Sequence, residues 1–203
     1  MRILIAVPTF ENISPETFKS IYNLKKSPDD ILDFDFVKGY DCAVARNKIA
    51  EKAVDGSYDY VLMVDSDIIL PNNTLECLLE HEDDIVLAPY PSKSDPSKLE
   101  IYLYGAIGGY PKDARFDKEF YYKRLKTENE YRYIINGGGF GCALIRTLTF
   151  ALQQRPWFCY MDYGDGSLLS EDLYFCTKSR HFGYTIYTDL RVQCSHIAKK
   201  IYS

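Results

Sequence analysis

Two carboxylates follow the most apolar segment of the chain. Residues 60–64 contain no polar break, and the chain then continues with Asp65-Ser66-Asp67. Side chains at positions i and i+2 of an extended backbone point to the same side, so these carboxylates repel each other unless a cation joins them. Mg²⁺ and Mn²⁺ prefer carboxylate oxygen as a ligand. The triplet therefore predicts a divalent cation site, with a capped turn before Pro71 as the alternative.

The segments around this triplet alternate between strand and helix. Strands are predicted at residues 3–7, 34–38, 60–64 and 85–88. Helices are predicted to begin between them, at Ser14, Asp41 and Pro71. We expect Val44, Ala50 and Val54 to form the buried face of the second helix. The alternation implies a parallel, doubly wound sheet, whose ligands bind beyond the carboxyl ends of the strands.

The second half of the chain has a different character. Residues 91–133 are rich in tyrosine and mixed in charge, which predicts long loops or a flap. A helix is predicted from Ser170 to about Phe182, with Gly183 as the residue that ends it. This half is expected to be antiparallel or mixed. Its predicted strands are residues 131–135, 142–145, 184–187 and 191–195.

The composition is that of one globular domain spanning residues 1–203. Of the 203 residues, 46% are apolar, which is enough for a core that needs neither a metal nor a disulfide. The 29 acidic residues outnumber the 24 lysines and arginines, and this net charge of −5 argues against nucleic acid as a partner. No segment has the ~20 consecutive apolar residues of a membrane span.

The cysteines and the amino-terminal segment indicate a compartment. The 6 cysteines fall in apolar segments with no C-x-x-C pair, which favours reduced thiols in the core over a disulfide framework. The first apolar run ends at Pro8 and is too short for a signal peptide. We therefore expect a cytoplasmic protein without a membrane span.

The triplet and two other early segments resemble GT-A glycosyltransferases, in particular the family 2-like members, which take nucleotide-sugar donors. Asp65-Ser66-Asp67 resembles the D-x-D element of that family. Ala6-Val7-Pro8-Thr9 resembles its first strand and nucleoside-binding turn, and Ala45-Arg46-Asn47 resembles the A-R-N start of a helix. The small size is also similar to that of glycosyltransferase domains of large algal viruses.

Three later segments continue the resemblance. Gly138-Gly139-Phe140-Gly141-Cys142 is similar to the glycine-rich segment under the donor sugar, and Ser170-Glu171-Asp172 is similar to the acidic pair that opens the following helix. His196 matches the late histidine that completes the metal shell in many members. Without the resemblance, a surface position beside Lys199 and Lys200 would be expected for His196.

The resemblance implies the GT-A fold. This fold is a Rossmann-like three-layer α/β/α sandwich with a mostly parallel central sheet and a smaller antiparallel or mixed part in the C-terminal half. Residues 1–90 would form the nucleotide-binding half of a single domain, and residues 91–203 would form the half that binds the acceptor and completes the metal site. The chain could equally be one catalytic domain of a longer protein.

The resemblance also implies ligands for the metal and the donor. Asp67 and His196 would bind the metal, and Asp65 would reach it through water or bind the ribose hydroxyls. A glycine backbone beside the donor sugar would leave amides free for its hydroxyls, although a tight turn explains Gly137-Gly138-Gly139 equally. The residues implied in donor binding are Pro8, Thr9, Asp41, Arg46, Asp65, Ser66, Asp67, Gly138 and Gly139.

Asp172 and Glu171 are the implied catalytic residues. In an inverting enzyme Asp172 would remove the proton from the acceptor hydroxyl, and in a retaining enzyme it would hold the sugar. Both acids also lie in the first turn of a helix, where the helix dipole stabilises them without any catalytic role. Three aromatic residues just before Asp165-Gly166 either stack on an acceptor sugar or form a half-buried cluster. They are Trp157, Tyr160 and Tyr163.

One departure from the family concerns the base of the nucleotide. The D-D-G-S segment after the second strand is absent, and Lys38-Gly39-Tyr40-Asp41 stands in its place. Asp41 or Asp35 is then the candidate that accepts the N–H of uracil. Uracil offers one donor between two carbonyl acceptors, so one carboxylate and flanking amides would suffice for its recognition.

These observations predict a metal-dependent glycosyltransferase of the hexosyl or deoxyhexosyl class that uses Mn²⁺ or Mg²⁺. The donor is expected to be a UDP-sugar, the acceptor a glycan or another hydroxyl compound, and the location the host cytoplasm if the protein is viral. A nucleotidyltransferase acting on sugar phosphates is one alternative, but residues 8–12 lack its glycine- and arginine-rich loop. The other alternative is a non-catalytic carbohydrate-binding domain, which the 18 tyrosines would suit. The sequence makes no prediction of the oligomeric state.

Overall fold

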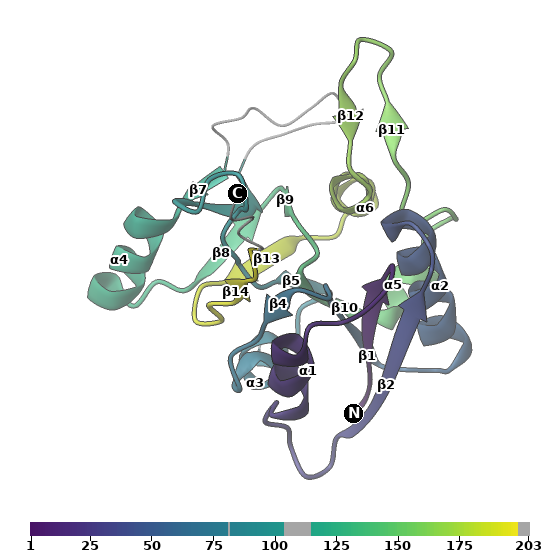
Figure 1. Cartoon of the computed structure of the whole chain (residues 1–203), viewed down its shortest axis with the longest axis horizontal. Helices are drawn as coiled ribbons and strands as arrows, with labels where there is room; N and C mark the ends of the chain where they lie inside the picture. Colours follow the sequence, from purple (N-terminus) through teal and green to yellow (C-terminus); the bar gives the residue numbers. More distant parts are fainter. Residues whose placement is uncertain (81, 104–114, 199–203) are drawn as a thin grey trace, which may run out of the picture.

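A mixed seven-stranded sheet forms the centre of the molecule (Figure 1). The computed structural model describes residues 1–80, 82–103 and 115–198. In spatial order the strands are β2 (Ile31–Lys38), β1 (Arg2–Thr9), β3 (Tyr60–Val64), β10 (Cys142–Arg146), β5 (Ile85–Leu87), β13 (Ile186–Asp189) and β8 (Arg132–Ile135). All neighbouring pairs are parallel except those of β10 with β3 and β5, and of β8 with β13.

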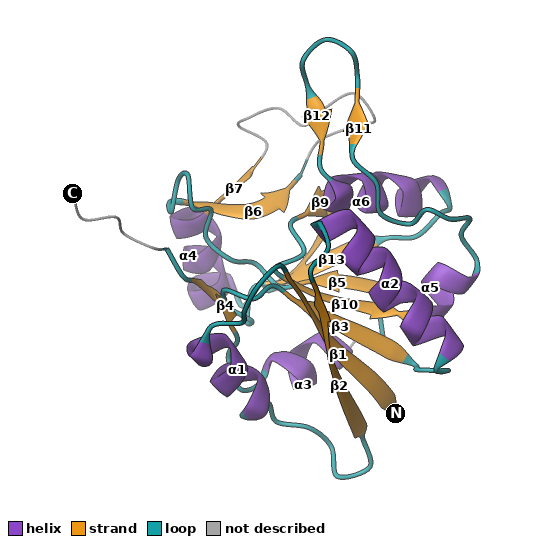
Figure 2. Cartoon of the chain, turned by 45° about the vertical axis from the view of Figure 1, so that its right-hand side comes forward, coloured by secondary structure: helices purple, strands orange, loops and turns teal. Residues whose placement is uncertain are grey.

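Helices cover both faces of this sheet, so the expected three-layer α/β/α arrangement is confirmed (Figure 2). On one face lie α2 (Cys42–Asp55), α5 (Thr147–Ala151) and α6 (Glu171–His181), and on the other lie α1 (Pro15–Tyr22) and α3 (Thr74–Leu79). Alternate side chains of β3 serve the two layers. Val61 packs in the cluster with Ile49 of α2, and Leu62 packs in the cluster with Leu75 of α3.

Side-chain caps fix where the first two helices begin. Ser14 Oγ accepts a hydrogen bond of 3.0 Å from the amide of Thr17, and Asp41 Oδ1 accepts one of 3.0 Å from the amide of Val44. Each such cap stabilises its helix by ~1 kcal/mol. The buried face of α2 differs from the expected one, because Val44 is exposed and Arg46 is buried.

The region between residues 91 and 133 is more regular than expected. The described residues contain β6 (Lys98–Tyr102), β7 (Arg115–Asp117) and α4 (Lys118–Glu128), so the expectation of long loops is wrong there. Asp117 begins α4, because its Oδ1 accepts a hydrogen bond of 3.0 Å from the amide of Phe120. The rest of the expected flap, residues 104–114, lies outside the described residues.

Three short pairings complete the fold. β9 (Gly137–Gly138) joins β6 and β7 in a three-stranded sheet, so Gly137 and Gly138 form a strand. β4 (Ile68–Ile69) pairs with β14 (Ser195–His196), and only the end of the strand expected at residues 191–195 is present. β11 (Met161–Asp162) and β12 (Leu168–Leu169) form a hairpin that projects at the top of Figure 1.

The cysteines are free thiols, as expected, but the expectation that all of them lie in the core is wrong. Four of them are buried, whereas Cys42 is exposed and Cys159 is intermediate. Within the described part of the chain, none of the helices has the length and apolar character needed to cross a membrane.

Candidate functional site

A cavity of about 550 Å³ lies where β1 and β3 end. Because the carboxyl ends of parallel strands meet at one edge of a sheet, segments far apart in sequence come together there. Seven of the predicted site residues are in its wall. The lining residues are Pro8, Thr9, Phe10, Tyr40, Asp41, Cys42, Asp65, Ser66, Asp67, Lys93, Tyr160 and His196.

The Asp65-Ser66-Asp67 segment is a turn and not the extended backbone that we expected. The amide of Ile68 donates to the carbonyl oxygen of Asp65 at 3.2 Å, and the amide of Asp65 donates to that of Gly141 at 3.0 Å. The turn gives the two carboxylates different partners. Asp65 contacts Arg46, whereas Asp67 contacts Lys93 and His196.

A short antiparallel ladder places His196 beside Asp67. His196 pairs with Ile68 across β14 and β4, and the amide of Ile197 donates to the carbonyl oxygen of Asp67 at 2.9 Å. This leaves His196 Nε2 3.5 Å from Asp67 Oδ1. The other ring nitrogen, Nδ1, is 2.9 Å from the carbonyl oxygen of Pro91, and a proton on Nδ1 leaves the lone pair of Nε2 facing the cavity.

The surroundings of Asp67 keep its carboxylate ionised. The contact with His196 lowers the pKa of Asp67 to about 2 against the effect of burial, with Lys93 acting in the same direction. Burial by itself would lower the pKa of His196, but the contacts with Asp67 and Pro91 outweigh it, and the net shift is upward. Asp67 is therefore an anion over the whole physiological pH range.

Asp67 and His196 suit two positions in the shell of one divalent cation. Ligands at 2.0–2.1 Å in an octahedral shell are about 3 Å from their neighbours, close to the 3.5 Å that separates Oδ1 from Nε2. No cluster of three or more His, Cys, Asp or Glu side chains that could hold a metal occurs among the described residues. The remaining positions suit phosphate oxygens and water, as is usual for Mg²⁺.

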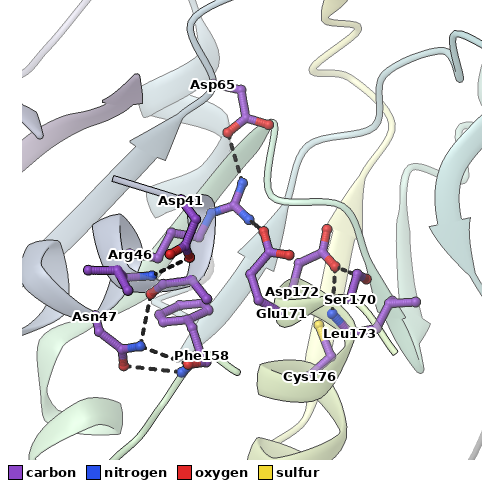
Figure 3. A network of polar contacts seen from close by, with 12 residues as sticks. Asp41, Arg46, Asn47, Asp65, Phe158, Ser170, Glu171, Asp172, Leu173 and Cys176 are labelled. Atoms are coloured by element: carbon purple, nitrogen blue, oxygen red, sulfur yellow. Dashed lines mark hydrogen bonds and ion pairs between the residues drawn. The ribbon is translucent and has the colours of Figure 1, made fainter. Parts of the chain in front are cut away.

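A buried arginine, Arg46, lies between Asp65 and Glu171 (Figure 3). Arg46 Nη2 donates to Asp65 Oδ1 at 2.8 Å, and Nη1 donates to Oε1 of Glu171. Burial opposes the charge of Arg46, but Asp65 and Glu171 outweigh it and raise the pKa of Arg46. Arg46 is not among the residues that line the cavity, so its expected contact with the donor is replaced by two contacts with carboxylates.

The two acids at the start of α6 have different surroundings. Glu171 is buried, and burial raises its pKa while Arg46 opposes the shift. Asp172 is half-buried, and its Oδ1 accepts hydrogen bonds from Ser170 Oγ and, at 2.8 Å, from the amide of Leu173 (Figure 3). Glu171 is thus tied to Arg46, whereas the contacts of Asp172 involve one of its two oxygens.

The glycine segment does not line the cavity. The amide of Gly139 donates to the carbonyl oxygen of Glu100 at 2.9 Å, and Gly138 pairs with Ile101 of β6. A Cβ on Gly139 would lie 1.9 Å from Tyr90 Oη, so this glycine is needed for close packing. The expectation of a free Gly139 amide for the donor sugar is therefore wrong.

Of the two candidates for base recognition, only Asp41 lies in the cavity wall. Its Oδ1 caps α2, so the expected alternative, a helix cap, is present. Asp35 instead forms an ion pair of 2.7 Å with Lys52 and lines a separate surface hollow.

The aromatic residues before α6 divide between the core and the site. Trp157 is buried, with its ring 5.6 Å from that of Phe150, so it is a core residue. Tyr160 lines the cavity. Asn47 holds the chain between them, because its Oδ1 accepts from the amide of Trp157 at 3.0 Å and its Nδ2 donates to the carbonyl oxygen of Phe158 at 2.7 Å.

Lys93 is the charged cavity residue that the sequence interpretation missed. Its Nζ is 2.5 Å from Asp67 Oδ2. A signal for it was present, because Lys93 follows β5 and the carboxyl ends of parallel strands collect ligand-binding residues. Phe10, Tyr40 and Cys42 were also missed, and they follow β1 or β2 in the same way.

The comparisons with known proteins concern structure and not sequence. No family model matches the chain, and no curated protein matches it. Among solved structures the chain is similar to A197 from STIV, with a TM-score of 0.67 and 16% identity over 98% of this chain and 87% of that chain. It is also similar to GalNAc-T7, solved with UDP, GalNAc and Mn²⁺, with a TM-score of 0.60 and 12% identity over 97% of this chain.

The chain spans 44% of the length of that GalNAc-T7 chain. A further match, the inositol-1-phosphate CTP transferase from T. maritima, has a TM-score of 0.46 and 10% identity, and no conclusion rests on it. At such identities the likeness shows the fold alone. Together with the mixed seven-stranded sheet and its two helical layers, the first two similarities confirm the expected GT-A-like fold.

Proposed function

We propose that the protein is a metal-dependent, family 2-like glycosyltransferase that moves a hexosyl or deoxyhexosyl group from a UDP-sugar to a hydroxyl of a glycan or another acceptor. The observation that carries the proposal is the Asp67–His196 pair, held by the β4–β14 ladder in the wall of a cavity at the ends of β1 and β3. A GT-A-like fold and a neighbour solved with UDP and Mn²⁺ support it. The proposed location of the protein is the cytoplasm, or the host cytoplasm if the protein is viral.

In this proposal, different residues of the cavity wall would bind different parts of the donor. Pro8, Thr9 and Asp41 would hold the nucleoside, and the free oxygen of Asp41 would accept the N–H of uracil. Asp67 and His196 would hold Mn²⁺ or Mg²⁺ against the two phosphates. The metal supplies charge stabilisation for the diphosphate leaving group, which is strongest where water is excluded.

We assign the catalytic carboxylate to the pair of acids at the start of α6, Glu171 and Asp172. Asp172 would take the proton from the acceptor hydroxyl or hold the donor sugar, since it is less buried than Glu171 and is not tied to Arg46. Glu171 and Arg46 would position Asp65, which in turn would bind the ribose hydroxyls. Residues 1–90 then serve the nucleotide, and residues 91–203 serve the acceptor and complete the metal site through His196.

The test is an assay of nucleoside diphosphate release over a panel of nucleotide sugars with Mn²⁺. We expect release from at least one UDP-sugar by the wild type and by Asp35→Asn, a matched control within β2 that lies outside the cavity. Asp67→Asn should lose that release by 10²-fold or more, roughly as for loss of an electrostatic stabiliser. Pyrophosphate release from a nucleoside triphosphate, with no turnover of any nucleotide sugar, would contradict the proposal.

The choice of uridine has its own test. UDP with Mn²⁺ should raise the melting temperature more than GDP, CDP or TDP, because groups left unpaired by the wrong base cost roughly 1–3 kcal/mol each. Stronger stabilisation by GDP than by UDP would exclude a uridine site.

A further inference from the structure

Lys93 lies between two cavities. The first is the candidate donor cavity, and a second of about 660 Å³ lies beside it. The two share Ser66, Asp67 and Lys93 in their walls. The ion pair between Lys93 Nζ and Asp67 Oδ2, at 2.5 Å, therefore forms a partition that both cavities touch.

The backbone around Lys93 is fixed, but its ammonium group has room to move. The amide of Ser92 donates to the carbonyl oxygen of Lys98 at 2.9 Å, and Arg115 Nη1 donates to Ser92 Oγ at 3.1 Å. The carbonyl oxygen of Pro91 contacts His196, so the same loop orients the histidine. The side chain of Lys93 is 52% exposed and has space on both sides.

The contact of Lys93 conflicts with a metal on Asp67. Asp67 presents Oδ1 to His196 and Oδ2 to Lys93, so the carboxylate has a cation before any ligand arrives. A divalent cation at Oδ1 would then lie within a few ångströms of an ammonium group, and the two charges repel each other. A nucleoside diphosphate reverses the sign of this effect, because its phosphate oxygens attract both cations.

We propose that Lys93 makes the binding of the metal depend on the binding of the nucleoside diphosphate. The proposal rests on the function proposed above. With the cavity empty, Lys93 pairs with Asp67 and opposes the metal. When a nucleoside diphosphate is present, the ammonium leaves Asp67 for a phosphate oxygen, and Asp67 becomes available to the metal. The two ligands consequently bind cooperatively, each raising the affinity for the other by the same factor.

Calorimetric titrations of Mn²⁺, alone and with saturating UDP, test this coupling. Without UDP, Lys93→Gln should bind Mn²⁺ more tightly than the wild type does, because the competing ammonium group is gone. With saturating UDP, its affinity for Mn²⁺ should be no higher than that of the wild type. The ratio of the two Mn²⁺ affinities should thus fall about tenfold or more, within the usual range of coupling between sites. Lys93→Arg retains the charge and should keep most of the wild-type ratio.

Lys98→Gln is the matched control. Lys98 is the next cation along the chain and pairs with Asp117 at 3.2 Å, outside both cavities. Its variant should keep the wild-type ratio. Melting curves of each variant establish that it is folded before titration.

Two results would overturn the inference while leaving the proposed function in place. One is a wild-type ratio retained in Lys93→Gln, which would make the ion pair a surface contact. The other is a loss of UDP affinity in that variant with unchanged Mn²⁺ binding in both titrations, which would make Lys93 a phosphate ligand without any coupling. A wild type that binds neither UDP nor Mn²⁺ would overturn the proposed function as well.

Discussion

Two clusters of opposite charges meet at this site and differ in their exposure to water. In the first cluster Arg46 and Glu171 are buried, with side chains 3% and 7% exposed. In the second, Asp67 and Lys93 are 35% and 52% exposed. Charges that cannot reach water need each other, whereas exposed charges exchange one partner for another at little cost. The first cluster is therefore suited to fixing the shape of the site, and the second to binding a ligand.

The largest expected effect is on the buried cluster. Arg46→Met leaves Glu171 buried without its partner, and removal of one member of a buried ion pair costs about 3–5 kcal/mol of the free energy of unfolding. Urea unfolding of the variant measures this loss. Arg155→Met is the control, because Arg155 forms an exposed pair with Glu51 and should contribute less than about 1 kcal/mol. Equal losses in both variants would remove the distinction between the clusters.

The next effect separates the two acids of α6. Asp172→Asn should lower turnover on the order of 10²-fold, as for loss of a general base, with UDP affinity and the free energy of unfolding close to those of the wild type. Glu171→Gln should instead lower the free energy of unfolding, because Glu171 is the buried partner of Arg46. Normal turnover in Asp172→Asn would leave that residue as a helix-terminal charge.

The smallest effect is expected from the exposed cluster. Lys93→Gln removes an ion pair whose two side chains are each more than a third exposed. Such exposed pairs contribute about 0–1 kcal/mol to the free energy of unfolding. The free energy of unfolding of this variant should therefore lie within about 1 kcal/mol of the wild-type value. A loss as large as that of Arg46→Met would show that Lys93 has a structural role, and the two clusters would then be alike.

The sequence predicted the central strands and helices because their signals are local. The unbroken apolar run of β3 and the caps Ser14 and Asp41 are visible without any knowledge of the rest of the fold. The exposed Val44 and the buried Arg46 were not predictable in this way. A charged residue is almost never fully buried unless it is paired, and the partners of Arg46 are 19 and 125 positions away in sequence.

The candidate site was predictable as a set of residues but not as a set of contacts. Asp65-Ser66-Asp67 at the end of β3 was identified from residue type and spacing, whereas Thr9 at the end of β1 and the late His196 were identified from the resemblance to GT-A glycosyltransferases. The β4–β14 ladder that joins Asp67 to His196 was not, because strands of two residues have no periodic pattern. The Lys93 contact was missed for a related reason, since a single lysine in a loop is normally a solvated residue.

The most direct test of the account is the affinity for UDP measured with Mn²⁺ and with a chelator. Wild type and Asp35→Asn should bind UDP more tightly with Mn²⁺, because Asp67 and His196 hold the cation against the phosphates. Asp67→Asn should bind UDP equally well under both conditions. If Asp67→Asn keeps the metal dependence of the wild type, the metal lies elsewhere and the central assignment is wrong.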